Sequence, residues 1–338
     1  MKIITRVFGL MLLFSCIVMF NQHPLYAEDG DNPISITLTP GKYISVKGDK
    51  EKFRTHHWMK EGFSGGIDHF SIVGAEVSDN TTMDFEGRFF HKDNDIDATM
   101  NLTNEELGIL YVDYTAFRKY FDNTGGYYDT FGRYKEVSLD DEMHLDIGNL
   151  LIKITPTMEN FHNLSFTYEH DNKVGTKSRL TWAEVEESAS GLTKNIAPVA
   201  NDISEVTDTF TFEGETELVG YDVKAEQKIE RTKISSLRVA QDVADTGTAA
   251  DYNLRRHFKD PESLVYTTTL NGEQWFDDDT AFVGLAYRYE SLENHELENI
   301  EVTQLGALSG DQVTNAYATN NVDAHTVVGH YMKRVTPN

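Results

Sequence analysis

Apolar and polar residues alternate in short runs along this chain, from about residue 67 to its end. Every even-numbered residue of Asp95–Leu102 is apolar and every odd-numbered one is polar, and Met83–Phe89 and Thr209–Leu218 come close to the same pattern. A period of two places successive side chains on opposite faces of a β-strand. The pattern therefore predicts a succession of strands, each with one apolar and one polar face.

The expected strands follow one another along most of the chain. They lie at residues 67–77, 81–91, 95–102, 107–121, 143–154, 162–170, 177–185, 207–219, 220–231, 263–272, 280–290, 299–305 and 322–333. Short connections rich in Asp and Asn, which favour tight turns, lie at 78–80, 92–94 and 277–279, and longer polar loops are expected at 122–141, 186–206, 232–262 and 306–321. This pattern predicts an all-β fold: an antiparallel transmembrane β-barrel of about 12–14 strands, with short periplasmic turns and longer extracellular loops.

The stretch Ala281–Glu290 shows how the two faces differ. One face carries Ala, Val, Leu, Tyr and Tyr, and the other carries Phe, Gly, Ala, Arg and Glu. Tyrosines at the end of an apolar face are typical of the aromatic girdle of a membrane protein. We therefore expect Leu285 to face lipid and Ala286 to face the interior.

The chain is strongly acidic, with a net charge of −25, and this charge disfavours nucleic acid as a partner. The carboxylates have two interpretations: acidic loops that keep the chain soluble during export, or an interior that attracts cations. The candidate lumen-facing residues are the charged residues on the polar strand faces, namely Asp84, Glu86, Arg88, Asp95, Asp97, Glu213, Glu215, Glu217 and Arg288. The mean hydropathy of −0.45 is compatible with a barrel, because only alternate strand residues need be apolar.

Residues 1–27 have the features of a Sec-type signal peptide. Lys2 and Arg6 mark a basic start, Val7–Phe20 is apolar, and Ala27 is a small residue at the expected cleavage site. The apolar stretch is shorter than the roughly 20 residues of a membrane-spanning helix. An alternative is lipoprotein-type cleavage with acylation of Cys16, the only cysteine. Cleavage after Ala27 would leave a mature chain without disulfides or thiolate ligands.

Residues 28–66 differ in pattern and are expected to form a periplasmic N-terminal segment that plugs or flanks the barrel. Two short strands are expected at residues 34–39 and 43–46, separated by Pro40 and Gly41. The barrel is expected over residues 67–338, either complete or lacking part of its C-terminal end.

The sequence contains no motif typical of an enzyme or a metal site. GxSxG, HExxH and the Walker A loop are absent, and without CxxCH the chain attaches no c-type haem of its own. Asp93–Asp97 resembles the start of a calcium-binding loop, but Ala98 replaces the required glycine and Asn104 replaces the bidentate glutamate. We therefore expect no catalytic residues, no enzymatic activity, no metal and no cofactor.

Several stretches resemble the outer-membrane barrels that surround multihaem cytochromes, the decahaem-associated electron-conduit porins. They are Gly62–Phe70, the aromatic hairpin Phe117–Tyr128, and the strand pairs at 208–231 and 280–290. The resemblance covers most of residues 60–335 and rests on alternation and turns. It implies a wide barrel that houses a cytochrome encoded elsewhere, with this shorter chain as a truncated or partial member, and it assigns no site residues.

Together these features favour a porin-like β-barrel that forms a channel or a scaffold across the bacterial outer membrane, with outer-membrane lipid as its surroundings. Two alternatives stay open. One is a barrel sheath for a periplasmic or extracellular multihaem c-type cytochrome in extracellular electron transfer. The other is a soluble exported all-β binding protein.

Overall fold

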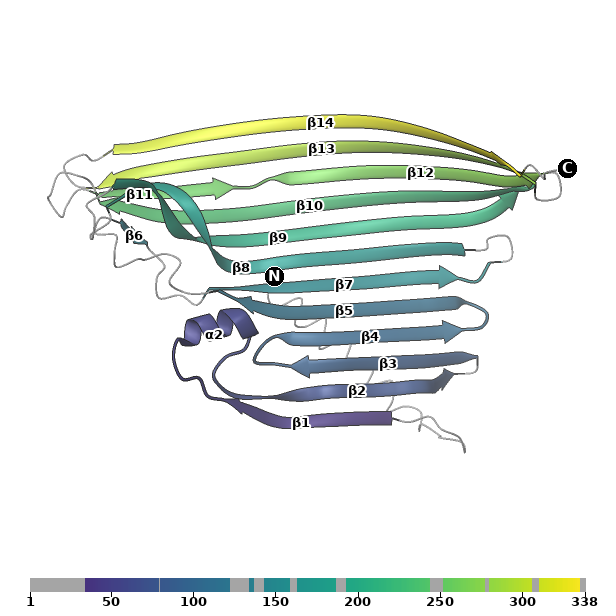
Figure 1. Cartoon of the computed structure of the whole chain (residues 1–338), viewed down its shortest axis with the longest axis horizontal. Helices are drawn as coiled ribbons and strands as arrows, with labels where there is room; N and C mark the ends of the chain where they lie inside the picture. The colour runs from purple at the N-terminus through teal and green to yellow at the C-terminus, as the bar shows by residue number, and fades with distance from the viewer. Residues whose placement is uncertain are drawn as a thin grey trace.

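The fold is one antiparallel β-sheet with a single short helix on one side (Figure 1). The structure is a computed structural model, and it describes residues 34–78, 80–121, 134–136, 143–158, 163–186, 193–243, 252–276, 280–305 and 310–334. Within these ranges, no helix has the length and apolar character needed to cross a membrane. The all-β, antiparallel architecture predicted from the sequence is confirmed.

Fourteen strands and helix α2 make up the described chain. Their bounds are β1 Ile34–Ile44, α2 Lys50–His57, β2 Gly62–Ser78, β3 Thr81–Phe90, β4 Asp95–Asn104, β5 Gly108–Tyr120, β6 Tyr134–Glu136, β7 His144–Pro156, β8 Asn163–Glu186, β9 Thr193–Leu218, β10 Tyr221–Val243, β11 Tyr252–Lys259, β12 Glu262–Phe276, β13 Ala281–Leu305 and β14 Gly310–Lys333.

Strands β11 and β12 are two segments of one line in the sheet. Both pair with β10 on one side and with β13 on the other, and Asp260 and Pro261 interrupt them. Strand β6 adds only three residues beside the end of β10. With β11 and β12 taken together and β6 left out, twelve strands remain, and their directions alternate across the sheet.

Several strands are longer than the alternation predicted. Strand β8 unites the stretches expected at 162–170 and 177–185, and β13 unites those expected at 280–290 and 299–305. The loops expected at 186–206, 232–262 and 306–321 are largely strand, because β9 starts at Thr193, β10 runs to Val243 and β14 starts at Gly310. In these extensions both faces carry polar residues, so the alternation fades. The backbone pairing nevertheless continues. Most of the loop expected at 122–141 lies outside the described residues.

The N-terminal segment joins the sheet at its edge. Strand β1 is one strand rather than the two expected, and the register with β2 shifts between Thr39 and Lys42, where Pro40 and Gly41 lie. A bulge accommodates these two residues, since proline cannot donate to the ladder. The boundary expected between residues 66 and 67 falls inside β2.

Helix α2 was not expected from the sequence. Its N-cap is Asp49, whose carboxylate accepts a hydrogen bond from the backbone N–H of Lys52 at 3.0 Å. At its other end Trp58 adopts a left-handed conformation, and its N–H donates to the Arg54 carbonyl at 2.8 Å. His56 and His57 lie in the last turn of this helix.

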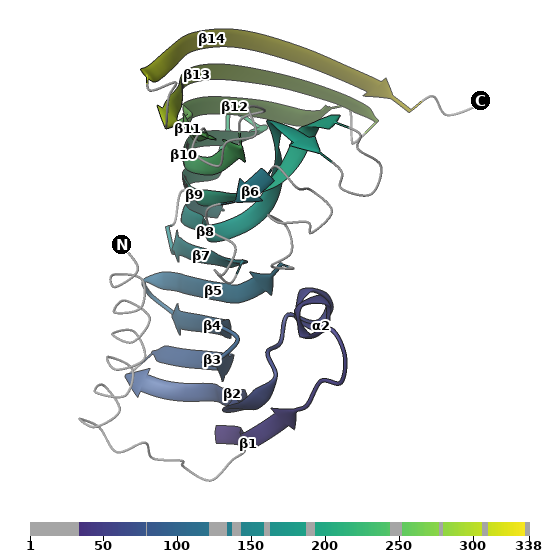
Figure 2. The ribbon, with the colours of Figure 1, turned by 90° about the vertical axis from the view of Figure 1, so that its left-hand side faces the viewer.

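The sheet is bent, with β1 at one edge and β14 at the other (Figure 2). It curves toward the side on which α2 lies, so this side is called the concave face and the opposite side the convex face. Among the described residues, neither β1 nor β14 has a strand partner along its outer edge.

Gly108 provides a test of the turn between β4 and β5. Its φ of +115° is unfavourable for other residues, and an added β-carbon would lie 2.1 Å from the Thr155 carbonyl oxygen. Gly108→Ala should therefore destabilise the protein by more than the roughly 1–2 kcal/mol of left-handed strain alone. The measurement is the midpoint of chemical unfolding, followed by tryptophan fluorescence.

Gly272→Ala is the matched control for this change, because an added β-carbon there meets nothing within 4 Å. It should leave the midpoint nearly unchanged. Equal midpoints for the two variants would contradict the described turn.

Candidate functional site

A continuous row of apolar side chains crosses the convex face of the sheet. Each member lies directly opposite the next on the neighbouring strand, so all share one face. From β2 to β12 the row is Ile72, Phe85, Met100, Val112, Ile152, Tyr168, Phe210, Ile229 and Tyr266. Nine neighbouring strand segments therefore contribute an apolar group at the same level.

The row belongs to a wider apolar band of limited height. On β9 the convex-face positions from Phe210 to Leu218 carry no charge, and neither do those on β10 from Tyr221 to Ile229. Asp208 and Arg231 follow them, and single apolar residues recur farther along, at Val206, Leu237 and Val239. About nine strand residues, inclined as in membrane barrels, cover the roughly 25 Å of an apolar membrane band.

Charged groups lie on the same convex face where the band ends. Arg118 donates two hydrogen bonds to the Asp146 carboxylate, at 2.6 and 2.8 Å. On the next strands Asp208 accepts from Tyr168 at 2.8 Å and contacts His170 at 2.7 Å. The charged groups are thus paired with one another at the edge of the band.

Many side chains of the band are exposed, although they are large and apolar. Leu285 is 60% exposed, Phe212 53% and Ile154 45%. No described segment covers this face, and an exposed apolar patch that crosses many strands marks a surface for interaction with a partner or a membrane.

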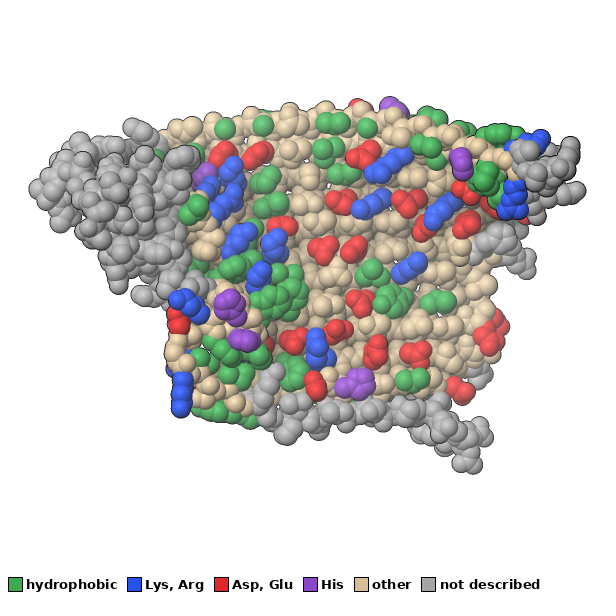
Figure 3. Space-filling view, viewed as in Figure 1, with side chains coloured by type: hydrophobic (Ala, Val, Ile, Leu, Met, Phe, Trp, Pro, Cys, Tyr) green, Lys and Arg blue, Asp and Glu red, His purple; other side chains and the backbone are tan. Residues whose placement is uncertain are grey.

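The concave face is polar at the same level. A second row of directly opposed residues crosses it and consists of Asp84, Asn101, Tyr111, Lys153, Thr167, Thr211, Lys228, Thr267 and Glu290. Figure 3 shows acidic and basic side chains spread over this face. The two faces of the sheet therefore differ in polarity at this level.

The nine predicted lumen-facing residues all lie on the concave face, according to the strand register. Arg88 contacts Asp95 at 3.0 Å and Asp97 at 3.9 Å. Arg288 forms an ion pair with Glu290 at 2.5 Å. All three acids keep more than a third of their side chain exposed, so these pairs add little stability.

The remaining predicted acids are spread over two regions of this face. Asp84 accepts a hydrogen bond from the Gly74 N–H at 2.7 Å, at a bulge of β2. On β9, Glu213 pairs with Lys224, and Glu215 accepts from the Asn163 amide at 2.9 Å. Side-chain partners are not found for Glu86 or Glu217 within the described ranges.

Helix α2 packs on the concave side of β5. The Trp58 ring stacks on Phe117, with centroids 5.5 Å apart and planes inclined by 13°, and the Lys119 ammonium lies 5.7 Å from the Trp58 ring. Beside this contact the concave face has a groove, lined by Thr115, Phe117, Ile147, Asn149, Asp171, Lys173, Glu205 and Thr207. The helix therefore narrows the space next to the groove.

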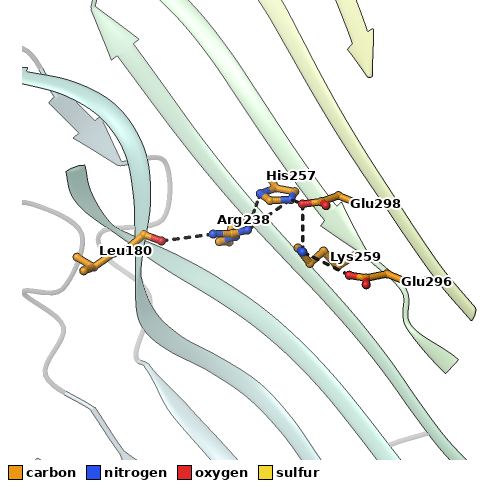
Figure 4. A network of polar contacts seen from close by, with 6 residues as sticks. All are labelled: Leu180, Arg238, His257, Lys259, Glu296 and Glu298. Atoms are coloured by element: carbon orange, nitrogen blue, oxygen red, sulfur yellow. Dashed lines mark hydrogen bonds and ion pairs between the residues drawn. The ribbon is translucent and has the colours of Figure 1, made fainter. Parts of the chain in front are cut away.

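A second element folds over the concave face. The β8–β9 arm, defined as residues 176–186 and 193–200, extends beyond the last β7 partner of β8 at Gly175 and the last β10 partner of β9 at Asn201. The Leu180 carbonyl of this arm accepts a hydrogen bond from Arg238 at 3.3 Å (Figure 4).

Arg238 also begins a polar network that the sequence did not reveal. Its guanidinium contacts His257, His257 contacts Glu298, and Lys259 reaches the Glu298 carboxylate at 3.1 Å (Figure 4). Burial opposes ionisation of Glu298, but hydrogen bonds from Lys259 and His257 hold its pKa below the usual value. These residues come from three strands, so only the pairing of β10, β11 and β13 brings them together.

Basic groups without a carboxylate partner gather near this network. Burial lowers the pKa of Lys177, and the charges of Lys173 and Arg179 lower it further. No salt bridge of Lys177 or Arg179 is found in the described part of the chain. Groups of His, Cys, Asp and Glu that could hold a metal ion are likewise not found there.

Comparison with protein-family models, with curated proteins and with solved structures finds no match to this chain. The functional argument therefore rests on the faces of the sheet and on the elements that fold over them.

Phe117 provides a test of the α2 packing. Phe117→Leu removes the ring on which Trp58 stacks, and such pairs contribute about 0.5–1.5 kcal/mol. Limited trypsin digestion at Lys50, Lys52 and Arg54 should then accelerate about 2- to 10-fold. Phe166→Leu on the convex face is the control and should leave the cleavage rate unchanged, whereas equal rates in all three proteins would show that the stack does not hold α2.

Proposed function

We propose that this chain is an outer-membrane β-barrel, with its convex face in lipid and its concave face around a polar channel or scaffold interior. The observation that carries the proposal is the apolar row from Ile72 to Tyr266, with a polar row one residue away on the other face. A soluble protein would cover the apolar row with a second layer, and no such layer lies in the described ranges.

Closure of the sheet by pairing of β1 with β14 is part of this proposal. In lipid every backbone N–H and C=O needs a partner, so an open edge is not tolerated. With twelve alternating strands, β1 and β14 run in opposite directions, as antiparallel closure requires. The bend of the sheet carries both edges toward the concave side (Figure 2).

The interior of such a barrel would be lined by the concave face, with α2 and the β8–β9 arm folded inward. An open interior would make the protein a porin-like channel. The resemblance to electron-conduit porins supports a second possibility, in which a multihaem cytochrome occupies the same interior. In an open channel the residues of the concave face contact water, and in a cytochrome sheath the same residues contact the cytochrome.

Leu285 tests the assignment of the lipid face. It lies between Gly272 and Gly329 on the neighbouring strands, so its side chain stands free on the convex face. Leu285→Arg should impair membrane assembly, because arginine near the bilayer midplane costs roughly 2–4 kcal/mol in such barrels. The measurement is the fraction of folded protein recovered from lipid vesicles, read from heat-modifiable gel mobility.

The matched control is Ala286→Arg, which places the same charge on the concave face two residues from Arg288. It should assemble nearly as well as the parent chain. Equal assembly of both variants, or assembly without lipid or detergent, would reject the membrane proposal.

The acids of β9 test whether the interior conducts. Carboxylates along a wall of low dielectric concentrate cations, so an open barrel should prefer cations over anions. Neutralising Glu213, Glu215 and Glu217 together to Gln should reduce that preference. The measurement is the reversal potential of a planar bilayer under a KCl gradient.

Glu262→Gln combined with Glu293→Gln removes acids from the convex face and serves as control, with no expected change. An anion preference, or an unchanged potential in the triple variant, would show that the β9 acids do not set the field. Conductance that appears only after a cytochrome partner is removed would identify the scaffold function instead.

A further inference from the structure

The β8–β9 arm leaves the sheet at a position that admits only a small residue. Gly175 has a φ of +145°, and an added β-carbon would lie 2.0 Å from the His144 carbonyl oxygen. Beyond it, β8 and β9 pair with each other as far as Glu186 and Thr193. The arm turns toward the concave side (Figure 2). It therefore lies over the end of the concave face from which β8, β9 and β10 extend.

Arg238 attaches the arm to the sheet. It is 9% exposed, and its two terminal nitrogens serve different partners: Nη1 donates to the Leu180 carbonyl at 3.3 Å, and Nη2 lies 2.5 Å from His257 Nδ1 (Figure 4). The same guanidinium therefore holds the arm and contacts a histidine.

This contact favours a neutral His257. Arg238 Nη2 lies 2.5 Å from Nδ1 and 3.4 Å from Nε2, so a guanidinium, which only donates hydrogen bonds, lies against the ring. Nε2 also contacts the Glu298 carboxylate. A further proton on the ring would place a positive charge against Arg238.

Other groups oppose the closed position of the arm. Arg179 of the arm repels Arg238, and burial together with this repulsion lowers the pKa of Arg238. Arg238 Nε and the side-chain amide of the neighbouring Asn201 are buried without hydrogen-bond partners in the described ranges. Buried polar groups without partners are unfavourable, so they oppose the closed position of the arm.

We propose that Arg238, His257 and Glu298 form a pH-sensitive latch, which holds the β8–β9 arm over the concave face and releases it when His257 gains a proton. The arm then acts as a lid on one end of the interior. This inference concerns the arm alone and applies whether the interior conducts solutes or holds a partner.

The surroundings of His257 fix the direction of the pH effect. Burial lowers the pKa of His257 below its usual 6.5, and Arg238 and Lys259 lower it further, whereas Glu298 acts against them. Further charged groups around the latch are Lys177 and Arg179 on β8, Arg255 on β11 and Glu296 on β13.

In the open arm Arg238 loses its Leu180 partner and can turn away from His257, and water reaches the ring. The pKa of His257 then rises toward its usual value, although Lys259 and Glu298 stay beside it on the sheet, so the open state binds the proton more tightly than the closed state. The closed state is therefore fully favoured above about pH 6.5 and becomes less stable as the pH falls below that value.

Spin labels report the position of the arm directly. The full chain carries Cys16→Ser, Leu180→Cys and Ala318→Cys, and the two labelled sites are exposed. Pulsed electron–electron double resonance in detergent at pH 7.5 should give a single narrow distribution of the distance between the two labels. At pH 5.0 that population should be lost in favour of a broad and shifted distribution.

Two histidine variants separate the latch from general acid effects. His257→Gln retains an acceptor and a donor but no titration, and should keep the narrow distance at both pH values. His295→Gln, an exposed histidine of β13 outside the network, should respond to pH as the parent does.

Arg238→Gln should lose the narrow distance at both pH values, with an unchanged circular dichroism spectrum showing that the sheet is intact. An unchanged distance in the parent between pH 7.5 and 5.0 would overturn the latch. A pH response that persists in His257→Gln would also overturn it. Neither readout depends on membrane insertion or conductance, so failure of the latch and failure of the proposed function are distinguishable.

Discussion

Backbone hydrogen bonds between directly opposed residues keep the two faces of this sheet chemically different. A slip of one residue between two strands would move a whole apolar set to the other face. From β3 to β14 the described strand pairs show one register shift, between Trp182 and Val185 in the β8–β9 arm. The shifts near β1 and β2 lie at the sheet edge. The apolar row depends on this regularity, and so does the polar row opposite.

The same strands serve two purposes along their length. Within the band they alternate in polarity and separate an apolar surface from a polar one. Beyond it the alternation fades, and the extensions of β8, β9 and β10 carry the arm and its latch. Helix α2 occupies the concave side of β5. The β8–β9 arm and helix α2 thus lie outside the band, where polar contacts can be made and broken in water.

A period of two was enough to predict which residues share a face, so the predicted lumen residues from Asp84 to Arg288 all lie on the concave side. The ends of the strands could not be predicted where both faces are polar, as in β14 before Val322. Helix α2 is short and charged, with little apolar periodicity to reveal it. The latch joins His257 to Glu298, 41 residues away, through a strand pairing that no local pattern encodes.

Strand β14 is the longest uninterrupted edge of the sheet and pairs with β13 over its whole length without a register shift. It contains no proline, and its only lysine is Lys333 at the end. Natural edge strands usually carry proline or inward-pointing lysine, because these residues block pairing with another molecule. Until its outer edge is occupied, β14 is a template for a strand of a second copy. In the proposed barrel, closure within one chain is a first-order reaction, and it competes with a second-order association whose rate grows with protein concentration. A low protein concentration therefore favours closure.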